Sequence, residues 1–238
     1  MIDLKERINN RLGDNESRER KENTLYVSEI GNCIRKIFFR YNFPTSVDTQ
    51  TQKFFRRGDI THEDVTDLLK EEEDLVVKDE VPVTLYLRDS GFRLSGRVDD
   101  VIYEEDGGKY LVEKKTTGDV SKTKKYGASK HHKIQLMLYL GAMGYEKGML
   151  FYIDNDYNMY QENIDFDREF FHWCLDRAEN VAEHIKDDKI PMAEAKESDE
   201  GWLGWMCNYC DYSDTCNKLP NQKTDASEHD LEKMLKED

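Results

Sequence analysis

The segment GRVDDVIYEEDGGKYLVEKK (residues 96–115) contains two β-prone runs on either side of Asp106-Gly107. An Asp-Gly pair between such runs is a strong signal for a β-hairpin. Asp99 lies seven residues before Asp106, and Glu113 lies seven residues after it. The hairpin therefore places the two carboxylates opposite each other to within one residue, with Cβ atoms about 4.5–5.5 Å apart. At that separation both carboxylates are within reach of one cation.

The second strand of this hairpin also carries a lysine beside the acid. Side chains alternate along a strand, so Glu113 and Lys115 share a face while Lys114 points away. Mg²⁺ and Mn²⁺ prefer carboxylate oxygens, and an adjacent amine can take a proton from water or orient it. We therefore expect Asp99, Glu113 and Lys115 to form a catalytic metal site, with Asp100 as a competing ligand. The alternative is an exposed hairpin with weak cross-strand salt bridges.

Two outlying polar residues lie in apolar contexts. His62 is on the inward face of a helix predicted over 58–69, and is interpreted either as a metal ligand or as a satisfied core histidine. Gln135 is the one fully polar side chain in the apolar run 134–143. A buried amide without a partner costs about 1–3 kcal/mol, so Gln135 is expected to have a partner unless it faces solvent at a helix edge. Tyr139 follows one helical turn later on the same side.

The flanking segments predict the fold class. The β-prone runs and helical segments interleave, which predicts an α/β fold with a mixed central sheet flanked by helices. The runs expected as strands are 75–77, 81–87, 92–103, 109–116, 149–153 and 159–164, and the helices are 58–69, 134–145 and 168–186. A chain of 238 residues suits one main domain. We assign residues 1–24 to a polar lead-in, 25–220 to the domain and 221–238 to a disordered tail.

Three cysteines lie close together near the C-terminus, in the pattern Cys207-x₂-Cys210-x₅-Cys216. Zinc and iron–sulfur clusters usually take four ligands, so a fourth must come from elsewhere. Cys174 lies in an apolar stretch that favours a buried thiol. Cys33, beside polar residues, is the predicted fourth ligand. The site would join segments 25–43 and 202–219, and the spacing leaves the choice between zinc and a cluster open.

The charge of the chain is unevenly distributed. The net charge is −15, but residues 154–238 alone carry 23 acidic and 9 basic residues. Residues 109–133 contain eight lysines and two acidic residues. A polyanion responds to this local field, so Lys122, Lys124, Lys125 and Lys130 are candidate nucleic-acid contacts. The alternative is a solvated basic loop, and the acidic C-terminal part is a candidate surface for a protein partner.

Hydropathy gives no indication of a membrane protein. No run approaches 18 apolar residues, and the charged N-terminus is not followed by the apolar core of a signal peptide. We therefore expect no membrane association and a reducing cytoplasm, in which cysteines serve metal binding or chemistry.

Together these motifs resemble the PD-(D/E)xK nuclease superfamily, and within it the RecB-like exonucleases with an iron–sulfur cluster, including CRISPR-associated and phage-encoded members. The resemblance spans residues 26–216. The matching positions, in family order, are Cys33 in Cys-x-Arg, His62, Asp99 in Gly-Arg-Val-Asp, Glu113 and Lys115 in Glu-Lys-Lys, Gln135-x₃-Tyr139, and Cys207, Cys210 and Cys216.

The resemblance implies a restriction-endonuclease-like core and a specific set of roles. His62, Asp99 and Glu113 would bind Mg²⁺ or Mn²⁺, Lys115 would be the catalytic lysine, and Gln135 with Tyr139 would lie near DNA. The four cysteines would hold a structural [4Fe–4S] cluster. The expected activity is that of an exonuclease on DNA ends, single strands especially, in a prokaryote or its virus. The alternative is a non-catalytic or zinc-stabilised nucleic-acid-binding subunit of a recombination or CRISPR adaptation complex.

Overall fold

The centre of the molecule is a mixed β-sheet, seen in a computed structural model that describes residues 7, 20–45, 49–197, 201–225, 231 and 234. Its six strands run in the order β1-β3-β4-β5-β6, with β2 also paired to β3. The strands are β1 (Thr24–Tyr26), β2 (Leu75–Tyr86), β3 (Arg93–Glu104), β4 (Lys109–Thr116), β5 (Lys147–Ile153) and β6 (Met159–Asp165). The β1–β3 and β4–β5 pairs are parallel and the others antiparallel, which confirms the predicted mixed sheet.

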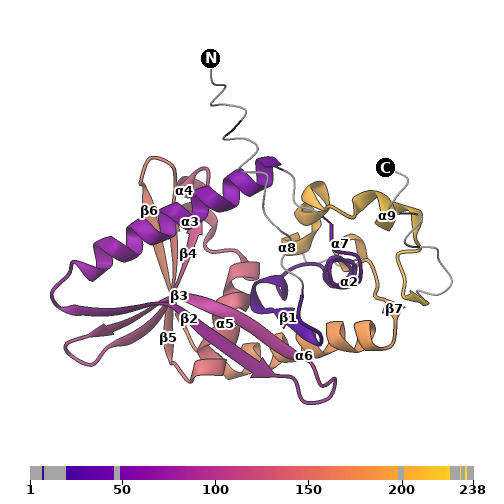
Figure 1. The fold of residues 1–238 in the computed structure, drawn as a ribbon, viewed down its shortest axis with the longest axis horizontal. Helices are drawn as coiled ribbons and strands as arrows, with labels where there is room; N and C mark the ends of the chain where they lie inside the picture. The colour runs from indigo at the N-terminus through magenta and orange to yellow at the C-terminus, as the bar shows by residue number, and fades with distance from the viewer. Residues whose placement is uncertain are drawn as a thin grey trace.

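Helices cover both faces of this sheet (Figure 1). The long α3 packs on β2 and β4 from one side, whereas α5 packs on β4 and β5 and carries α6 behind it. The helical segments are η1 (Val27–Glu29), α2 (Ile34–Asn42), α3 (Thr49–Lys70), α4 (Val120–Tyr126), α5 (Lys130–Met143), α6 (Arg168–Lys186), α7 (Glu194–Glu197), α8 (Gly201–Gly204), η2 (Trp205–Tyr209) and α9 (Ser213–Lys218). No helix within the described ranges is long and apolar enough to cross a membrane.

The apolar character of α5 follows from its position. Residues 134–140 are all buried, because the helix lies between the sheet and α6. Gly148 of β5 allows a close approach of α5, since a Cβ atom there would lie 3.0 Å from Leu136. This packing fixes α5 against the sheet at the level of Glu113 and Lys115.

Several elements differ from the sequence-based expectation. The strand over 109–116 and the helix over 168–186 are confirmed. The helix containing His62 begins at Thr49, nine residues before Gly58, because a single glycine costs a helix only about 1 kcal/mol. The two runs expected at 75–77 and 81–87 form one strand, β2, since both pair with the same long partner β3.

The C-terminal tail is not wholly disordered, which corrects the expectation for residues 221–238. Thr224 and Asp225 form β8, which pairs with β7 (Lys189–Ile190). Leu231 is buried against the cluster around Phe39. The prediction was wrong here because a two-residue strand and one apolar anchor leave no periodicity in the sequence. The remainder of that segment lies outside the described residues.

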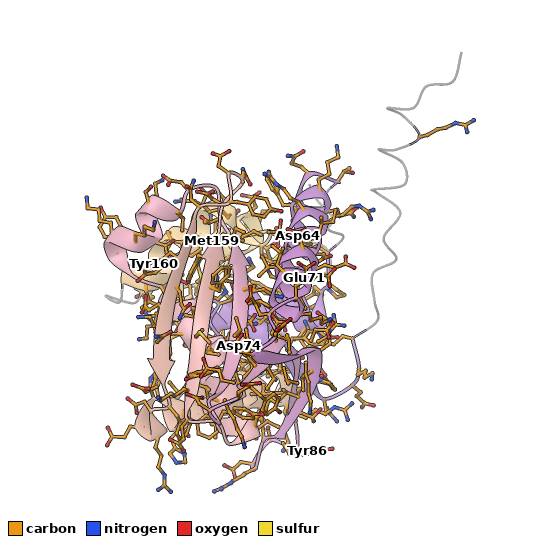
Figure 2. The ribbon with its side chains drawn as sticks, turned by 90° about the vertical axis from the view of Figure 1, so that its left-hand side faces the viewer. Asp64, Glu71, Asp74, Tyr86, Met159 and Tyr160 are labelled. Atoms are coloured by element: carbon orange, nitrogen blue, oxygen red, sulfur yellow. The ribbon has the colours of Figure 1, made fainter. Side chains whose placement is uncertain are left out.

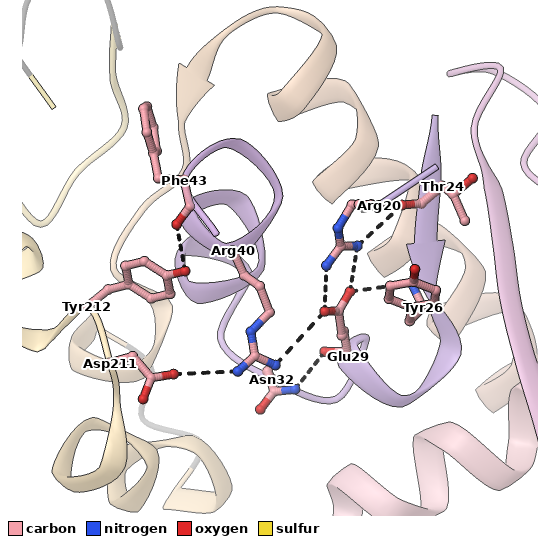
Figure 3. Close-up of polar contacts among 9 residues, drawn as sticks. All are labelled: Arg20, Thr24, Tyr26, Glu29, Asn32, Arg40, Phe43, Asp211 and Tyr212. Atoms are coloured by element: carbon pink, nitrogen blue, oxygen red, sulfur yellow. Dashed lines mark hydrogen bonds and ion pairs between the residues drawn. The ribbon is translucent and has the colours of Figure 1, made fainter. Parts of the chain in front are cut away.

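The lead-in and the C-terminal part meet on the same side of the molecule (Figure 3). Arg20 donates two hydrogen bonds, of 2.9 and 2.7 Å, to the buried carboxylate of Glu29. Arg40 of α2 lies 3.9 Å from Glu29 and 3.4 Å from Asp211. Residues 20–24 of the expected lead-in thus belong to the packed structure, whereas the others, apart from Arg7, lie outside the described residues.

Candidate active site and cysteine cluster

The β3–β4 hairpin has the register that its sequence predicts. Asp100 pairs with Val112, so continuing the ladder by one residue places Asp99 opposite Glu113. The turn is longer than a two-residue Asp-Gly turn. The amide of Glu104 donates to the carbonyl of Gly108 at 2.9 Å, and Gly107 has a φ of 96°. The two acids are therefore opposed about Asp106, with a three-residue connection between the strands.

Asp99 lies at a local gap in the sheet. The β3–β4 pairing ends at Asp100, and the backbone N–H of Lys114 donates to Asp99 Oδ2 at 2.7 Å. On the other side, the β2–β3 pairing passes over Glu80, which has a left-handed φ of 53°. Such strain costs a non-glycine residue about 1–3 kcal/mol and often marks functional sites.

Glu113 and Lys115 form a compact hydrogen-bonded group with α5. Lys115 Nζ lies 2.7 Å from Glu113 Oε1 and 3.0 Å from Gln135 Oε1. Gln135 Nε2 donates to Glu113 Oε1 at 2.5 Å. Gln135 is only 5% exposed, so the partner expected from the cost of burying an amide is present and the solvent-facing alternative is excluded. Gln135 holds the acid and the amine in a fixed relation.

Tyr139 forms a wall behind this group. It is 2% exposed, and its hydroxyl lies where a Cβ atom at residue 96 would be 2.5 Å away. Gly96 is thus required for the tyrosine to pack against β3. Gln135 and Tyr139 are both buried in this structure, and the expectation that they lie near DNA stays a prediction.

His62 approaches the acids from α3. Its Nδ1 lies 3.6 Å from Asp99 Oδ2, and its carbonyl accepts a hydrogen bond from Lys114 Nζ at 2.8 Å. The histidine is therefore tied to the hairpin through both its ring and its backbone.

The opposite face of the hairpin carries a second acid and lysine pair, and it includes Asp100, which the sequence left as a competing metal ligand. Lys114 Nζ lies 2.7 Å from Asp100 Oδ2 and also contacts the hydroxyl of Thr66 on α3. Thr66 in turn donates to Asp100 Oδ1 at 2.9 Å. Asp100 is fully buried. Strand alternation was the available signal, because it separates Asp100 and Lys114 from Asp99 and Lys115.

Burial shifts the pKa values of the side chains on the Asp99 face. Desolvation, together with the charge of Asp99, raises the pKa of Glu113 to about 8 against the opposing effect of Lys115. Desolvation also raises the pKa of Asp99. Desolvation and the nearby charges of Lys114 and Lys115 lower the pKa of His62 to about 4. The imidazole is therefore neutral at physiological pH, which is the form that binds metals.

Glu113 Oε2 and His62 Nε2 are among the buried side-chain atoms that have no hydrogen-bond partner in the described part of the chain. A buried acceptor without a partner is unfavourable unless a ligand completes it. Carboxylate oxygens with one imidazole nitrogen suit Mg²⁺ or Mn²⁺. In the arrangement described, no three His, Cys, Asp or Glu side chains form a complete ligand set. Lys115 and Gln135 hold Glu113 Oε1, but the open atoms fit a divalent ion.

The four predicted cysteines line one pocket of about 110 Å³. Cys33 precedes α2, Cys207 lies in η2, Cys210 follows it, and Cys216 lies in α9. Burial, and the proximity of the other thiols, raise the pKa values of Cys207 and Cys210. The Arg35 guanidinium lies 3.7 Å from Cys216 Sγ, a position suited to an anionic thiolate group. Cys174 is buried in the main core, away from this pocket.

The sequence matches the profile of the PD-(D/E)XK nuclease superfamily over residues 10–217. The chain belongs to this superfamily. It is 27% identical over 150 residues to the CRISPR-associated exonuclease Cas4 of Saccharolobus solfataricus, an alignment covering 63% of this chain and 72% of the relative. This relationship supports the resemblance that the motifs indicated.

Solved structures confirm the restriction-endonuclease-like fold of this PD-(D/E)XK nuclease. The structure of SSO0001 superposes with a TM-score of 0.67 at 24% identity, covering 91% of this chain and 98% of that one. LHK-Exo in complex with dAMP, an alkaline exonuclease of Laribacter hongkongensis, gives a TM-score of 0.52 at 14% identity, covering 69% of this chain and 88% of that one.

The candidate DNA-binding lysines of this nuclease fall into two groups. Lys122, Lys124 and Lys125 are exposed on α4. The ammonium of Lys130 instead contacts two aromatic rings. It lies 4.7 Å from the ring of Trp173 and 5.0 Å from that of Trp202. This cation–π sandwich joins α5 to the cysteine-bearing segment. Lys130 therefore contributes to the packing of these segments, and its expected contact with DNA stays a prediction.

Proposed function

We propose that this PD-(D/E)XK nuclease is a metal-dependent DNA exonuclease that hydrolyses phosphodiester bonds at DNA ends, with a preference for single strands. The observation that carries the proposal is the pair of unpartnered atoms, Glu113 Oε2 and His62 Nε2, next to Asp99 and Lys115. Relationship to an enzyme named as an exonuclease supports action at ends.

Asp99, Glu113 and His62 would hold Mg²⁺ or Mn²⁺ against the scissile phosphate. A bound divalent ion supplies positive charge to the phosphate and lowers the pKa of a bound water. Lys115 accepts or directs a water proton at Nζ, and Gln135 keeps that amine beside Glu113. Tyr139 and the apolar face of α5 exclude bulk water from behind the group.

The four cysteines are proposed to bind a structural [4Fe–4S] cluster. All four thiols line one pocket, which supports a single bound group with four thiolate ligands. The guanidinium of Arg35 beside Cys216 would offset the negative charge of a thiolate-bound cluster.

The activity test uses single-stranded oligonucleotides labelled at either end, with Mn²⁺ and anaerobically purified protein. We expect stepwise shortening of linear strands, no cutting of circular single strands, and no activity in Lys115→Ala. Absence of degradation by excess wild-type enzyme would remove the catalytic proposal and leave a nucleic-acid-binding subunit.

The cluster is tested separately by iron and acid-labile sulfide analysis. We expect about four of each per chain, because a [4Fe–4S] cluster contains four irons and four sulfides. Cys33→Ser is expected to lose most of this iron. One zinc per chain with no iron would instead establish the zinc-stabilised form.

A further inference from the structure

A groove of about 490 Å³ opens beside the candidate active site, between α3 and the connection from β5 to β6. Ile60 and Thr61, immediately before His62, line it from α3. Thr116, immediately after Lys115, lines it from β4. The groove is therefore continuous in sequence with both sides of the proposed metal site. Asp64 of α3 and Met159, where β6 begins, lie toward the same end of the sheet (Figure 2).

The α3 wall of the groove is basic. Lys53, Arg56 and Arg57 line it at helical spacings of three and four residues, which place them on one face of α3. None of the three forms an ion pair with another residue in the described part of the chain. Arg56 and Arg57 are exposed. Three cations that face a groove without an acidic partner form a binding surface for an anion.

The acid that also lines the groove is engaged by the chain itself. Asp154 Oδ1 accepts hydrogen bonds from the backbone amides of Asp156 and Asn158, both at 3.0 Å. These bonds lower its pKa and hold its charge in the turn after β5. Asp154 therefore stays ionised in the turn, but the three cations of α3 outnumber this one carboxylate, so the lining of the groove keeps a net positive charge.

An oriented aromatic ring closes the far wall. Tyr157 donates a hydrogen bond to Asp64 Oδ2 at 2.7 Å, which ties the β5–β6 connection to α3. The residue has a left-handed φ of 59° and remains 51% exposed. A fixed, half-exposed ring opposite a row of cations is the arrangement that binds single strands, with bases on aromatic faces and phosphates on basic groups.

We propose that this groove binds the backbone of single-stranded DNA next to the scissile phosphate, through Lys53, Arg56 and Arg57, with a base against Tyr157. The inference rests on the proposed nuclease function and names where its substrate lies. A volume of about 490 Å³ lies within the range of small-ligand pockets and suits a short stretch of a single strand. The lysines of α4 do not line this groove, so the principal contact surface is on α3.

Binding is measured by fluorescence anisotropy of a labelled 20-nucleotide poly(dT) in EDTA, which prevents cleavage. We expect the double variant Arg56→Gln/Arg57→Gln to bind about tenfold more weakly at 0.1 M NaCl. The slope of log affinity against log salt should become shallower by about 1.4. The matched control Lys109→Gln/Lys147→Gln removes two exposed cations from the starts of β4 and β5 and should bind like wild type.

A second measurement separates this proposal from the proposed function. Hydrolysis of bis(p-nitrophenyl) phosphate with Mn²⁺ needs the metal site and not an extended strand. We expect the Arg56/Arg57 variant to retain the wild-type rate on this small diester while KM for the oligonucleotide rises. Lys53→Gln, with one charge removed, should show a smaller effect in the same direction.

Each outcome tests either the groove proposal or the nuclease proposal. Wild-type affinity and salt dependence in the Arg56/Arg57 variant would overturn the groove proposal, as would an equal loss in the Lys109/Lys147 control. A fall in small-diester hydrolysis along with DNA binding would also overturn it, since the arginines would then be supporting the site itself. If wild type hydrolyses neither substrate but the Arg56/Arg57 variant alone loses DNA binding, the groove stands and the nuclease proposal fails.

Discussion

The two faces of the β3–β4 hairpin each carry an aspartate and a lysine from neighbouring positions. On one face, Asp100 and Lys114 are buried as an ion pair and share the hydroxyl of Thr66. On the other, Asp99 and Lys115 accompany Glu113, one of whose buried oxygens has no hydrogen-bond partner in the described structure. Adjacent residues of like chemistry thus form a closed ion pair on one face and the proposed reactive group on the other. The difference is whether all of their polar atoms have partners within the protein.

The largest expected effect is on activity, and it distinguishes Lys115 from Lys114. Lys115→Ala should lower the rate of oligonucleotide hydrolysis at least about 10³-fold, because it removes the amine beside the reacting water. Its free energy of unfolding should stay within about 1 kcal/mol of wild type, since Lys115 is partly exposed. Gel-based digestion and urea unfolding measure the two quantities. Normal cutting by this variant would contradict the assignment of the catalytic face.

The next expected effect is on stability, and it distinguishes Lys114 from Lys115. Lys114→Met should lower the free energy of unfolding by about 3–5 kcal/mol, because the charge of Asp100 is left buried without its partner. The double variant Lys114→Met/Asp100→Leu should recover most of this loss. Denaturant titration of both, with Lys115→Met as control, checks the difference. Equal destabilisation by the two lysine variants would show that the faces are not distinct.

A smaller effect sharpens the description of the catalytic face. Gly96→Ala should destabilise the protein by about 1–3 kcal/mol and reduce cleavage, because the new methyl group displaces Tyr139 from behind Glu113. Gly118→Ala is the matched control, since nothing lies within 4 Å of a Cβ atom there. Thermal unfolding and digestion rates suffice. A silent Gly96→Ala would mean that Tyr139 is not needed in its present position.

The smallest expected effect is on the number of protons that the protein releases when it binds a metal ion. With a pKa of about 8, Glu113 carries a proton at pH 7, so Mn²⁺ binding should release about one proton there and almost none above pH 9. Metal affinity should rise with pH up to about 8 and then level off. Calorimetry in two buffers of different ionisation enthalpy measures the release, and Glu113→Gln should release none. In the metal-free protein, the stability of the fold changes with pH in the opposite direction to metal affinity. The raised pKa of Glu113 contributes stability below about pH 4.5, and this contribution is lost as the pH approaches 8.

Much of the hairpin was predictable because its information is local. The position of Asp106-Gly107 sets the register, and alternation assigns Glu113, Lys114 and Lys115 to their faces. The cost of leaving a buried amide unpaired predicted that Gln135, if buried, has a hydrogen-bond partner, and it bonds Glu113 and Lys115.

Other features depended on contacts between segments far apart in the chain. The sandwich of Lys130 between Trp173 and Trp202 requires the docking of the C-terminal segment on α5, which no local pattern contains. The role of Gly96 depends on Tyr139, 43 positions later. The basic groove needs the turn after β5 to meet α3, so Arg56 and Arg57 did not appear in the sequence as part of a site.

The meeting of Cys33 with Cys207, Cys210 and Cys216 has a thermodynamic consequence for the whole enzyme. Any group that binds all four thiols closes a covalent ring through the polypeptide, and that ring contains every proposed catalytic residue from His62 to Gln135. By the chain-entropy relation for cross-links, restricting a loop of this length disfavours the unfolded ensemble by about 5 kcal/mol. Oxidative loss of the bound group would therefore lower the free energy of unfolding of the whole domain without touching any side chain of the hydrolytic centre.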